Sequence, residues 1–400
     1  MIVNCGLVVR GISVATKYKK YGRNNLNSHN LFNRYVNTSE SGTSLYQKLS
    51  SSFSVADGFI SQNNIEGSNI QLYANEFTGT YALQMEIGGQ KLDFVIDTLE
   101  PTFWVQGDKC IGLGCVIPFN QSGATSFYDS GKRYDDKLYR ISGEIVASDI
   151  NISGKKAKNV FFNLIDTEVG LFPGSGAIGM GRISSQGYPI SNSTPSPILA
   201  LYQQKVIKNN LFSLYLGRIP DPFKEPDVPI EQSLLTLGGI DTTLYTGDIN
   251  YFSVKDKDNW EIDLDDVIIN GKKLGIKRTI VLDTGSPNIF IPPEDFTTIN
   301  KLIPGAKLLG EYYMFPCNTN ANVSFIIGGV EYKINSKDLG SGYFTSDPRI
   351  PPDGWCMSSI YPGDKGTTWY FGGTFFRSIY AVFDYENSRV GLAHAAPRKN

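Results

Sequence analysis

Two apolar runs that each end in an Asp-Thr pair are the clearest pattern of hydrophobic and polar positions along the chain. Residues 92–96 lead into Asp97, and residues 279–282 lead into Asp283, each followed by threonine. Both runs are short, rich in branched and aromatic residues, and typical of buried strands. The repetition indicates an ancient duplication in which each half of the chain carries one carboxylate at a strand end.

Short apolar runs separated by glycine-rich turns continue through the chain and favour β structure over helix. Each half also has a later run of two apolar residues and a glycine, at residues 177–179 and 370–372. The best helix candidate spans residues 197–204. Strands are expected at residues 78–87, 91–96, 142–150, 211–217, 234–239, 325–330 and 379–384.

The first part of the chain has a different composition. Residues 11–68 are rich in Asn, Ser, Tyr and Lys, include a basic-aromatic cluster at residues 17–21, and show weak hydrophobic periodicity. Such a segment is either a disordered tail or a pro-segment. We therefore predict a leader and pro-segment over residues 1–68, a first β domain over 69–235, and a second over 236–400.

Histidine scarcity and charge balance exclude several function classes. The two histidines of the chain, His29 and His394, lie near its ends, so a Ser-His-Asp or Cys-His nucleophile and a histidine-rich zinc site are not expected. A net charge of −2 without a strongly basic stretch gives no indication of a nucleic-acid partner. We expect no cofactor and no metal, which leaves carboxylates for hydrolytic chemistry.

Cysteine usage indicates an oxidising compartment. Cys110 and Cys115 flank a short loop in the first half, and Cys317 and Cys356 lie in the second, so one disulfide is expected in each half. Four free buried thiols are the alternative, and a zinc site is a weak one because only one pair is closely spaced. Cys5 is expected to be unpaired or removed.

Four Asn-x-Ser/Thr sequons, at Asn37, Asn151, Asn192 and Asn322, permit passage through the secretory pathway. Residues 7–9 form a short apolar patch that matches a signal peptide poorly. No run is long enough to span a bilayer. We expect a secretory-pathway protein, either extracellular or in an acidic vesicle or vacuole.

With these motifs the chain resembles the pepsin-type aspartic proteases, from about residue 73 to residue 395. The resemblance rests on the two Asp-Thr strands and on a set of shorter motifs at residues 104–105, 110–115, 235–241, 280–286 and 382–393. It implies an all-β fold with two pseudo-twofold-related lobes, a few short helices and a monomeric, zymogen-derived peptidase. The composition of the leader vaguely resembles the plasmepsin branch of protozoan parasites.

The resemblance also implies roles for individual residues. Asp97 and Asp283 would share one proton and hold a water that attacks the scissile amide, because two carboxylates a few ångströms apart do not both ionise easily. Thr98 and Thr284 would buttress the two loops across the lobe interface, and Gly285 with Ser286 would complete the second loop.

The chain departs from the family pattern in two regions. Leu99 replaces the usual glycine, and its Cβ is expected to distort the loop or narrow the site. Glu100 replaces a hydroxyl residue, and a third carboxylate is expected to repel Asp97 and raise its pKa unless it points to solvent. The flap lacks its usual glycines, so Tyr134 or Tyr139 would serve as the flap tyrosine only after a shift in alignment.

Two functions therefore compete. The first is an aspartic endopeptidase that acts on extended peptides or proteins and is held inactive by its own pro-segment. The alternative is a catalytically impaired protein of the same fold that binds peptides without cutting them, motivated by Leu99, Glu100 and the atypical flap. If Leu99 and Glu100 disturb the site, the protein should be a poor or narrowly specific peptidase.

Overall fold

The computed structural model describes most of the chain from residue 65 onward. The described residues are 54, 65–76, 78–111, 115, 117–136, 141–167, 173–182, 196–220, 225, 227–310, 312–342 and 354–397. The basic-aromatic cluster at residues 17–21, Cys5 and Tyr139 lie outside them.

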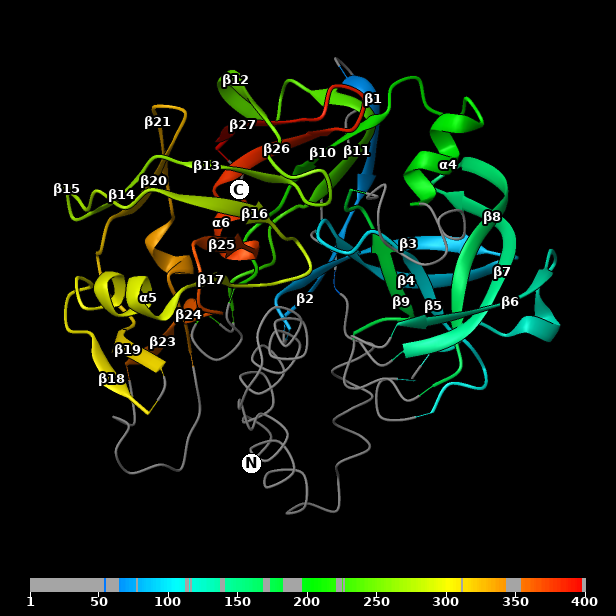
Figure 1. Ribbon diagram of the computed structural model, residues 1–400, viewed down its shortest axis with the longest axis horizontal. Helices are drawn as coiled ribbons and strands as arrows, with labels where there is room; N and C mark the ends of the chain where they lie inside the picture. Colours follow the sequence, from blue (N-terminus) through cyan, green and yellow to red (C-terminus); the bar gives the residue numbers. More distant parts are fainter. Residues whose placement is uncertain are drawn as a thin grey trace.

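An eight-stranded sheet builds the first lobe, at the right of Figure 1. Its hairpin between β3 and β4 turns at Gly88 and Gly89, whose φ angles of 52° and 85° suit the two-residue turn that matches strand twist. The strand order is β2 (Tyr73–Asn75), β3 (Thr80–Ile87), β4 (Gln90–Asp97), β9 (Gly176–Gly179), β5 (Phe103–Gln106), β8 (Lys155–Ile165), β7 (Ile141–Ile152) and β6 (Tyr128–Asp136).

Three smaller sheets build the second lobe, at the left of Figure 1. The five-stranded one runs β13 (Glu261–Leu264), β16 (Arg278–Leu282), β25 (Thr368–Phe371), β17 (Ile289–Ile291) and β24 (Ile360–Pro362). The first four-stranded sheet runs β15 (Lys272–Lys273), β14 (Asp266–Ile269), β20 (Val323–Ile327) and β21 (Val330–Lys333). The second runs β18 (Lys307–Leu309), β19 (Tyr312–Pro316), β23 (Trp355–Ser358) and β22 (Gly340–Gly342).

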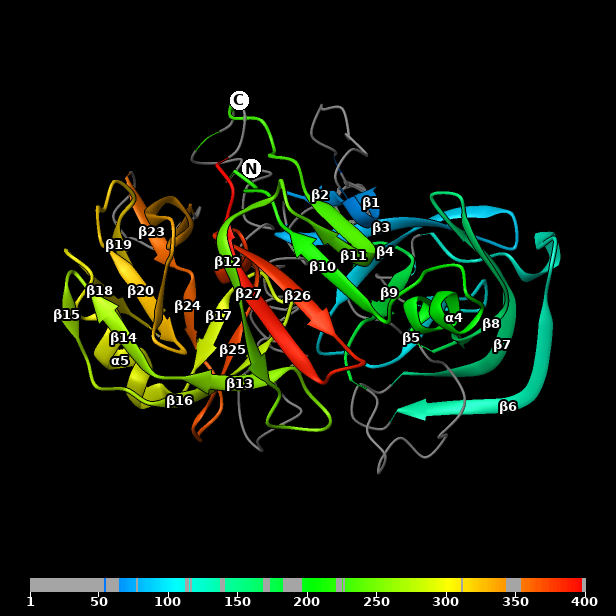
Figure 2. The same cartoon turned by 90° about the horizontal axis from the view of Figure 1, so that it is seen from above.

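A six-stranded sheet lies between the two lobes, as Figure 2 shows from above. Its strands come from the beginning, middle and end of the described chain, so it ties the lobes together. Phe212 of this sheet stacks on Phe383 with ring centroids 4.7 Å apart. The order is β1 (Ile65–Gln71), β11 (Leu234–Asp241), β10 (Leu211–Tyr215), β26 (Ile379–Asp384), β27 (Arg389–Ala395) and β12 (Tyr245–Ser253).

Helices are few and short in the described part of the chain. The α-helices are α4 (Pro197–Gln203), α5 (Pro293–Asn300) and α6 (Gly373–Phe376), with single 3₁₀ turns η1 (Gln121–Gly123) and η2 (Ser336–Asp338). Ser196 caps α4 through its hydroxyl, which accepts a hydrogen bond from the Ile198 N–H, and Pro197 occupies the first turn as expected for a helix start.

The predicted all-β, two-lobed architecture is confirmed, and the helix expected at residues 197–204 is α4. The predicted domain boundaries fall inside elements of the central sheet. Residue 68 lies within β1, and residue 235 lies within β11, with which β1 pairs antiparallel. Because this sheet draws on both ends of the chain, sequence composition alone did not indicate where the lobes divide.

Candidate active site

Asp97 is the last residue of β4, at the end of the buried half of that strand. β4 lies inside the eight-stranded sheet between β3 and β9, which explains why nearly all of residues 92–96 are apolar. Asp97 pairs in register with Gly179 on the parallel strand β9, and its carbonyl accepts a hydrogen bond from the Met180 N–H at 2.8 Å. The carboxylate-bearing residue is 9% exposed.

Asp283 has the same position in the second lobe. It directly follows β16, which lies between β13 and the parallel strand β25. Its N–H donates to the Phe371 carbonyl at 2.9 Å, and the residue is completely buried. The two aspartates thus end equivalent strands, as their sequence pattern predicts.

A glycine lies beneath each aspartate loop, in the two apolar-apolar-Gly runs. A Cβ on Gly179 would lie 2.2 Å from the Thr102 carbonyl oxygen, and one on Gly372 would lie 2.3 Å from the Ser286 carbonyl oxygen. Backbone atoms at those distances cannot give way, so only glycine allows this approach. The equivalent contact in both halves supports the pseudo-twofold relation between the loops.

The threonines after the aspartates join the two loops directly. The Thr98 N–H donates to the Thr284 hydroxyl oxygen at 3.1 Å, and the Thr284 N–H donates to the Thr98 hydroxyl oxygen at 3.0 Å. Each hydroxyl then donates across the interface to a carbonyl, Thr98 to Leu282 at 2.8 Å and Thr284 to Ile96 at 3.0 Å. These four buried bonds bring the strand ends that carry Asp97 and Asp283 together.

Leu99 occupies its loop without the expected distortion. Its N–H donates to Asp97 Oδ1 at 2.9 Å, as the Gly285 N–H donates to Asp283 Oδ1 at 3.1 Å. Neither Leu99 nor Gly285 has a positive φ, so this position does not require the conformational freedom of glycine. The Leu99 side chain is buried, with 3% of its surface exposed.

The side chain of Glu100 is buried, and one of its carboxylate oxygens is bonded to Thr102. It is 7% exposed, and its Oε1 accepts hydrogen bonds from the Thr102 N–H at 3.0 Å and from the Thr102 hydroxyl at 2.6 Å. Its own N–H donates to Asp97 Oδ1 at 3.0 Å. The backbone of Glu100 therefore supports Asp97, while its side chain is held by the outgoing loop.

Ser286 is equivalent to Glu100 in the second loop, but its hydroxyl turns away from Asp283. The Oγ atom forms two long hydrogen bonds of 3.4 Å with the backbone of Asn288, one to its carbonyl and one from its N–H. The Ser286 N–H donates to the Asp283 carbonyl at 3.3 Å. The two loops thus share the first backbone bond to the aspartate, from Leu99 and from Gly285, but differ at the next residue, where the Glu100 N–H donates to the Asp97 side chain and the Ser286 N–H to the Asp283 carbonyl.

Tyr134 is the one of the two expected flap tyrosines that lies among the described residues. It lies on β6 opposite Gly143 of β7 and is 5% exposed. It belongs to a small buried cluster with Trp104, Ile145 and other residues, separate from the main core. Trp104 is on β5, the strand after the Asp97 loop, so Tyr134 is connected to that loop through apolar packing.

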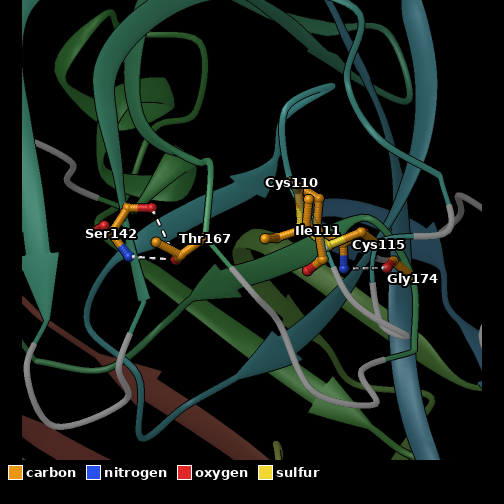
Figure 3. Close-up of a disulfide and its surroundings, with 7 residues drawn as sticks. Cys110, Ile111, Cys115, Ser142, Thr167 and Gly174 are labelled. Atoms are coloured by element: carbon orange, nitrogen blue, oxygen red, sulfur yellow. Dashed lines mark hydrogen bonds between the residues drawn. A yellow bond between two sulfur atoms is a disulfide. The ribbon is translucent and has the colours of Figure 1, made fainter.

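Both expected disulfides are present. Cys110 joins Cys115 with a Cα–Cα distance of 5.8 Å, and Cys317 joins Cys356 at 4.9 Å. The first bond, shown in Figure 3, packs against the cluster that contains Trp104. It therefore restrains a short loop after β5 rather than a long stretch of chain.

Sequence reasoning missed one residue that touches the backbone behind both aspartates. Trp260 is fully buried, and its indole N–H donates to the Met180 carbonyl at 2.9 Å. Its own carbonyl accepts a hydrogen bond from the Leu282 N–H at 3.1 Å. The signal in the sequence was weak, since a lone Trp ahead of a short strand is usual in a β protein.

Two negative findings apply to the described residues alone. They contain no group of three or more His, Cys, Asp or Glu side chains placed to hold a metal ion. No helix among them is long and apolar enough to cross a bilayer.

The eukaryotic aspartyl protease family model matches residues 80–395. The aspartic-type endopeptidase ctsD of Aspergillus fumigatus is 29% identical over 83% of this chain and 67% of its own length. A probable vacuolar protease A of Trichophyton verrucosum is 28% identical over 82% of each chain, and the embryonic pepsinogen of Gallus gallus is 27% identical over 80% of each. The chain spans only 60% of two further fungal relatives.

These relatives come from fungi and a bird, so the resemblance of the leader to the plasmepsin branch finds no support. The low-complexity composition that suggested that branch is shared by many unrelated leaders and was a poor guide. The match covers both aspartate loops, both lobes from β3 onward and the central sheet except β1. The chain belongs to the eukaryotic aspartyl protease family.

Proposed function

We propose that this chain is an aspartic-type endopeptidase in which Asp97 and Asp283 form the catalytic pair. The observation that carries the proposal is the set of reciprocal bonds between Thr98 and Thr284, because they hold the two aspartate-bearing strand ends against each other. A protein that only bound peptides would need neither two carboxylates nor such a symmetrical support.

The proposed chemistry needs the two carboxylates at close range, and the bonds between Thr98 and Thr284 support that placement. Ionising one makes ionising the other costly, so the pair holds a single proton over a range of acidic pH. The ionised member removes a proton from a bound water as the water attacks the scissile carbonyl, and the protonated member donates to the developing oxyanion. Amide N–H groups of Leu99, Glu100 and Gly285 orient the carboxylates.

The direct test is cleavage of a quenched peptide at acidic pH by the full chain and its variants. Asp97→Ala and Asp283→Ala should each abolish cleavage, and a statine-type inhibitor should block the parent. Asp263→Ala is the matched control, because that side chain is 62% exposed and pairs with Lys255 at the surface. Cleavage that survives in either site variant would mean a different mechanism.

The alternative of a catalytically impaired binding protein gains nothing from the comparisons, since the named relatives are endopeptidases and a pepsinogen. The structure also gives the binding-protein alternative less support than the sequence did. Leu99 keeps the same backbone bond as Gly285, and the side chain of Glu100 is held by Thr102.

We propose further that the leader is a pro-segment, which the kinship with a pepsinogen supports. The cut should fall before Ile65 rather than at residue 68, because β1 is an edge strand of the central sheet. Within it, Asn69 donates through Nδ2 to Asp241 at 2.6 Å and accepts from the Thr236 hydroxyl at 2.6 Å. A chain that begins at Ile65 should cleave the peptide at a mildly acidic pH at which the full chain is still inhibited.

The compartment and partners are proposed from the same relatives and from the disulfides. A vacuolar protease and a pepsinogen both support a secreted or vacuolar, lumenal location, and two disulfides suit an oxidising compartment. The partners would be peptide or protein substrates and the chain's own pro-segment. A monomer suffices, because a single chain supplies both aspartates.

A further inference from the structure

Two of the four glycosylation sequons lie in the described part of the chain, and the structure treats them very differently. They begin at Asn151 and at Asn322; Asn37 and Asn192 lie outside the described residues. An asparagine can carry an N-linked oligosaccharide in the folded protein only if its amide nitrogen faces open solvent and is not needed for an internal hydrogen bond.

Asn322 meets both conditions. It is exposed and directly precedes β20 (Val323–Ile327), so the chain turns the next residues inward while Asn322 stays outside. Its backbone is fixed by Asn270, whose Oδ1 accepts its N–H at 2.9 Å and whose N–H donates to its carbonyl at 2.8 Å. Within the described residues its side-chain amide forms no hydrogen bond.

Asn151 meets neither condition. It lies near the end of β7, in register with Glu86 on one side and Lys156 on the other, and is only partly exposed. Its Nδ2 donates to Glu86 Oε2 at 3.2 Å, and its Oδ1 accepts the Gly154 N–H at 2.8 Å. The oxygen of this amide holds the β7–β8 turn and its nitrogen holds Glu86 of β3, so a sugar on Nδ2 would displace the bond to Glu86.

We propose that Asn322 carries an N-linked oligosaccharide and that Asn151 remains unmodified. In the transfer, Nδ2 of Asn322 forms a bond to the anomeric carbon of a sugar donated by a polyprenyl-diphosphate oligosaccharide. The bond between that carbon and the diphosphate oxygen breaks, the diphosphate leaves with the electron pair, and the amide nitrogen gives up one proton. The proposal rests on the secretory location proposed above.

The position of Asn322 is compatible with the proposed peptidase activity. β14, β15 and β20 lie at the outer end of the second lobe, far left in Figure 1 and away from the central sheet. Asn270 and Asn322 close the end of the β14–β20 pair. A sugar there would project from the molecule on the side opposite the first lobe, so it should affect solubility and protease resistance without covering the aspartates.

The test is translation of the full chain in the presence of endoplasmic-reticulum membranes, followed by glycosidase digestion and peptide mass mapping. After enzymatic removal of the glycan, which converts the asparagine to aspartate, we expect the Asn322 peptide to be about one mass unit heavier than the unmodified peptide. In Asn322→Gln the mobility shift of the whole chain should decrease by the amount that one glycan causes. Asn151→Gln, the matched control, should leave the shift unchanged. Peptide mapping separates any sugar on Asn37 or Asn192.

A second version of the full chain, behind a cleavable signal sequence taken from another secreted protein, separates the two proposals. If only this version is modified at Asn322, the site is correct and the proposed location is wrong. If either version enters the membranes and Asn322 remains bare, or Asn151 is modified, the inference is overturned. Peptidase activity of Asn322→Gln should equal that of the parent.

Discussion

Trp260→Phe tests whether one buried residue supports both aspartate strands. The indole N–H holds the Met180 carbonyl, and the Met180 N–H donates to the Asp97 carbonyl. The Trp260 carbonyl in turn accepts the Leu282 N–H, one residue before Asp283. Phenylalanine keeps the backbone contact to Leu282 but removes the indole donor and the outer part of the ring system.

The expected cost can be worked out from these contacts. Loss of about three buried heavy atoms costs roughly 2 kcal/mol at ~0.8 kcal/mol per methylene equivalent. The lost hydrogen bond adds about 1 kcal/mol rather than a full desolvation penalty, because the Met180 carbonyl still accepts the Tyr385 hydroxyl at 2.7 Å. Burial raises the pKa of Tyr385, so its hydroxyl keeps the proton that it donates.

We therefore expect Trp260→Phe to lower the free energy of unfolding by about 3 kcal/mol, measured by urea denaturation at acidic pH. The kcat value on a quenched peptide should fall about tenfold, equivalent to ~1.4 kcal/mol of barrier, with little change in KM, because Asp97 loses its fixed backbone.

Tyr385→Phe is the matched control for this experiment. It removes the second donor to the Met180 carbonyl, the Tyr385 hydroxyl, and keeps the aromatic ring. We therefore expect a stability loss of only about 1 kcal/mol and an unchanged kcat. Equal effects of the two variants on both stability and kcat would refute the special role of Trp260. A stability loss below about 1 kcal/mol for Trp260→Phe would refute the packing estimate.

Three further predictions concern the loops and acid stability. Thr98→Val should cost about 2–4 kcal/mol in urea denaturation, because it leaves two buried cross-lobe partners without a bond; a loss under about 1 kcal/mol would contradict this. The double variant Leu99→Gly with Glu100→Ser should change kcat/KM less than tenfold, and a larger gain would show that these side chains do impair the site. Burial alone would raise the pKa of Asp384, but hydrogen bonds from Asn387 and Arg389 hold it below its ordinary value. The stability that they give is present above that ordinary value and is lost as the pH falls through the lowered pKa, so Arg389→Gln should unfold at a higher pH in an acid titration followed by fluorescence.

The sequence predicted those features that repeat or that depend on local pattern. The strands before Asp97 and Asp283, the two apolar-apolar-Gly runs and both cysteine pairs are found as expected. Hydrophobic periodicity reports burial along a strand, and the residues of β4 and β16 that lead directly into the aspartates are buried. Such features need no knowledge of the distant chain.

Features that depend on contacts across the lobes were not predictable in this way. Residue 68, the expected end of the leader, lies within β1, whose pairing with β11 joins positions 163 to 176 residues apart, and the Asn69–Asp241 bond spans 172 residues. The indole of Trp260 meets Met180 over a separation of 80 residues. No periodicity within a window of a dozen residues carries that information.

The first loop holds Leu99 and Glu100 without the distortion expected from their side chains, and the structure of the two loops gives a physical reason. Backbone N–H groups orient both aspartates, two of them on Asp97 and one on Asp283, and each loop closely approaches the strand beneath it. That approach depends on Gly179 and Gly372, where a Cβ would meet backbone oxygen at 2.2 and 2.3 Å. The glycine that this geometry cannot lose therefore lies under each loop rather than within it, and the first loop accommodates leucine and glutamate.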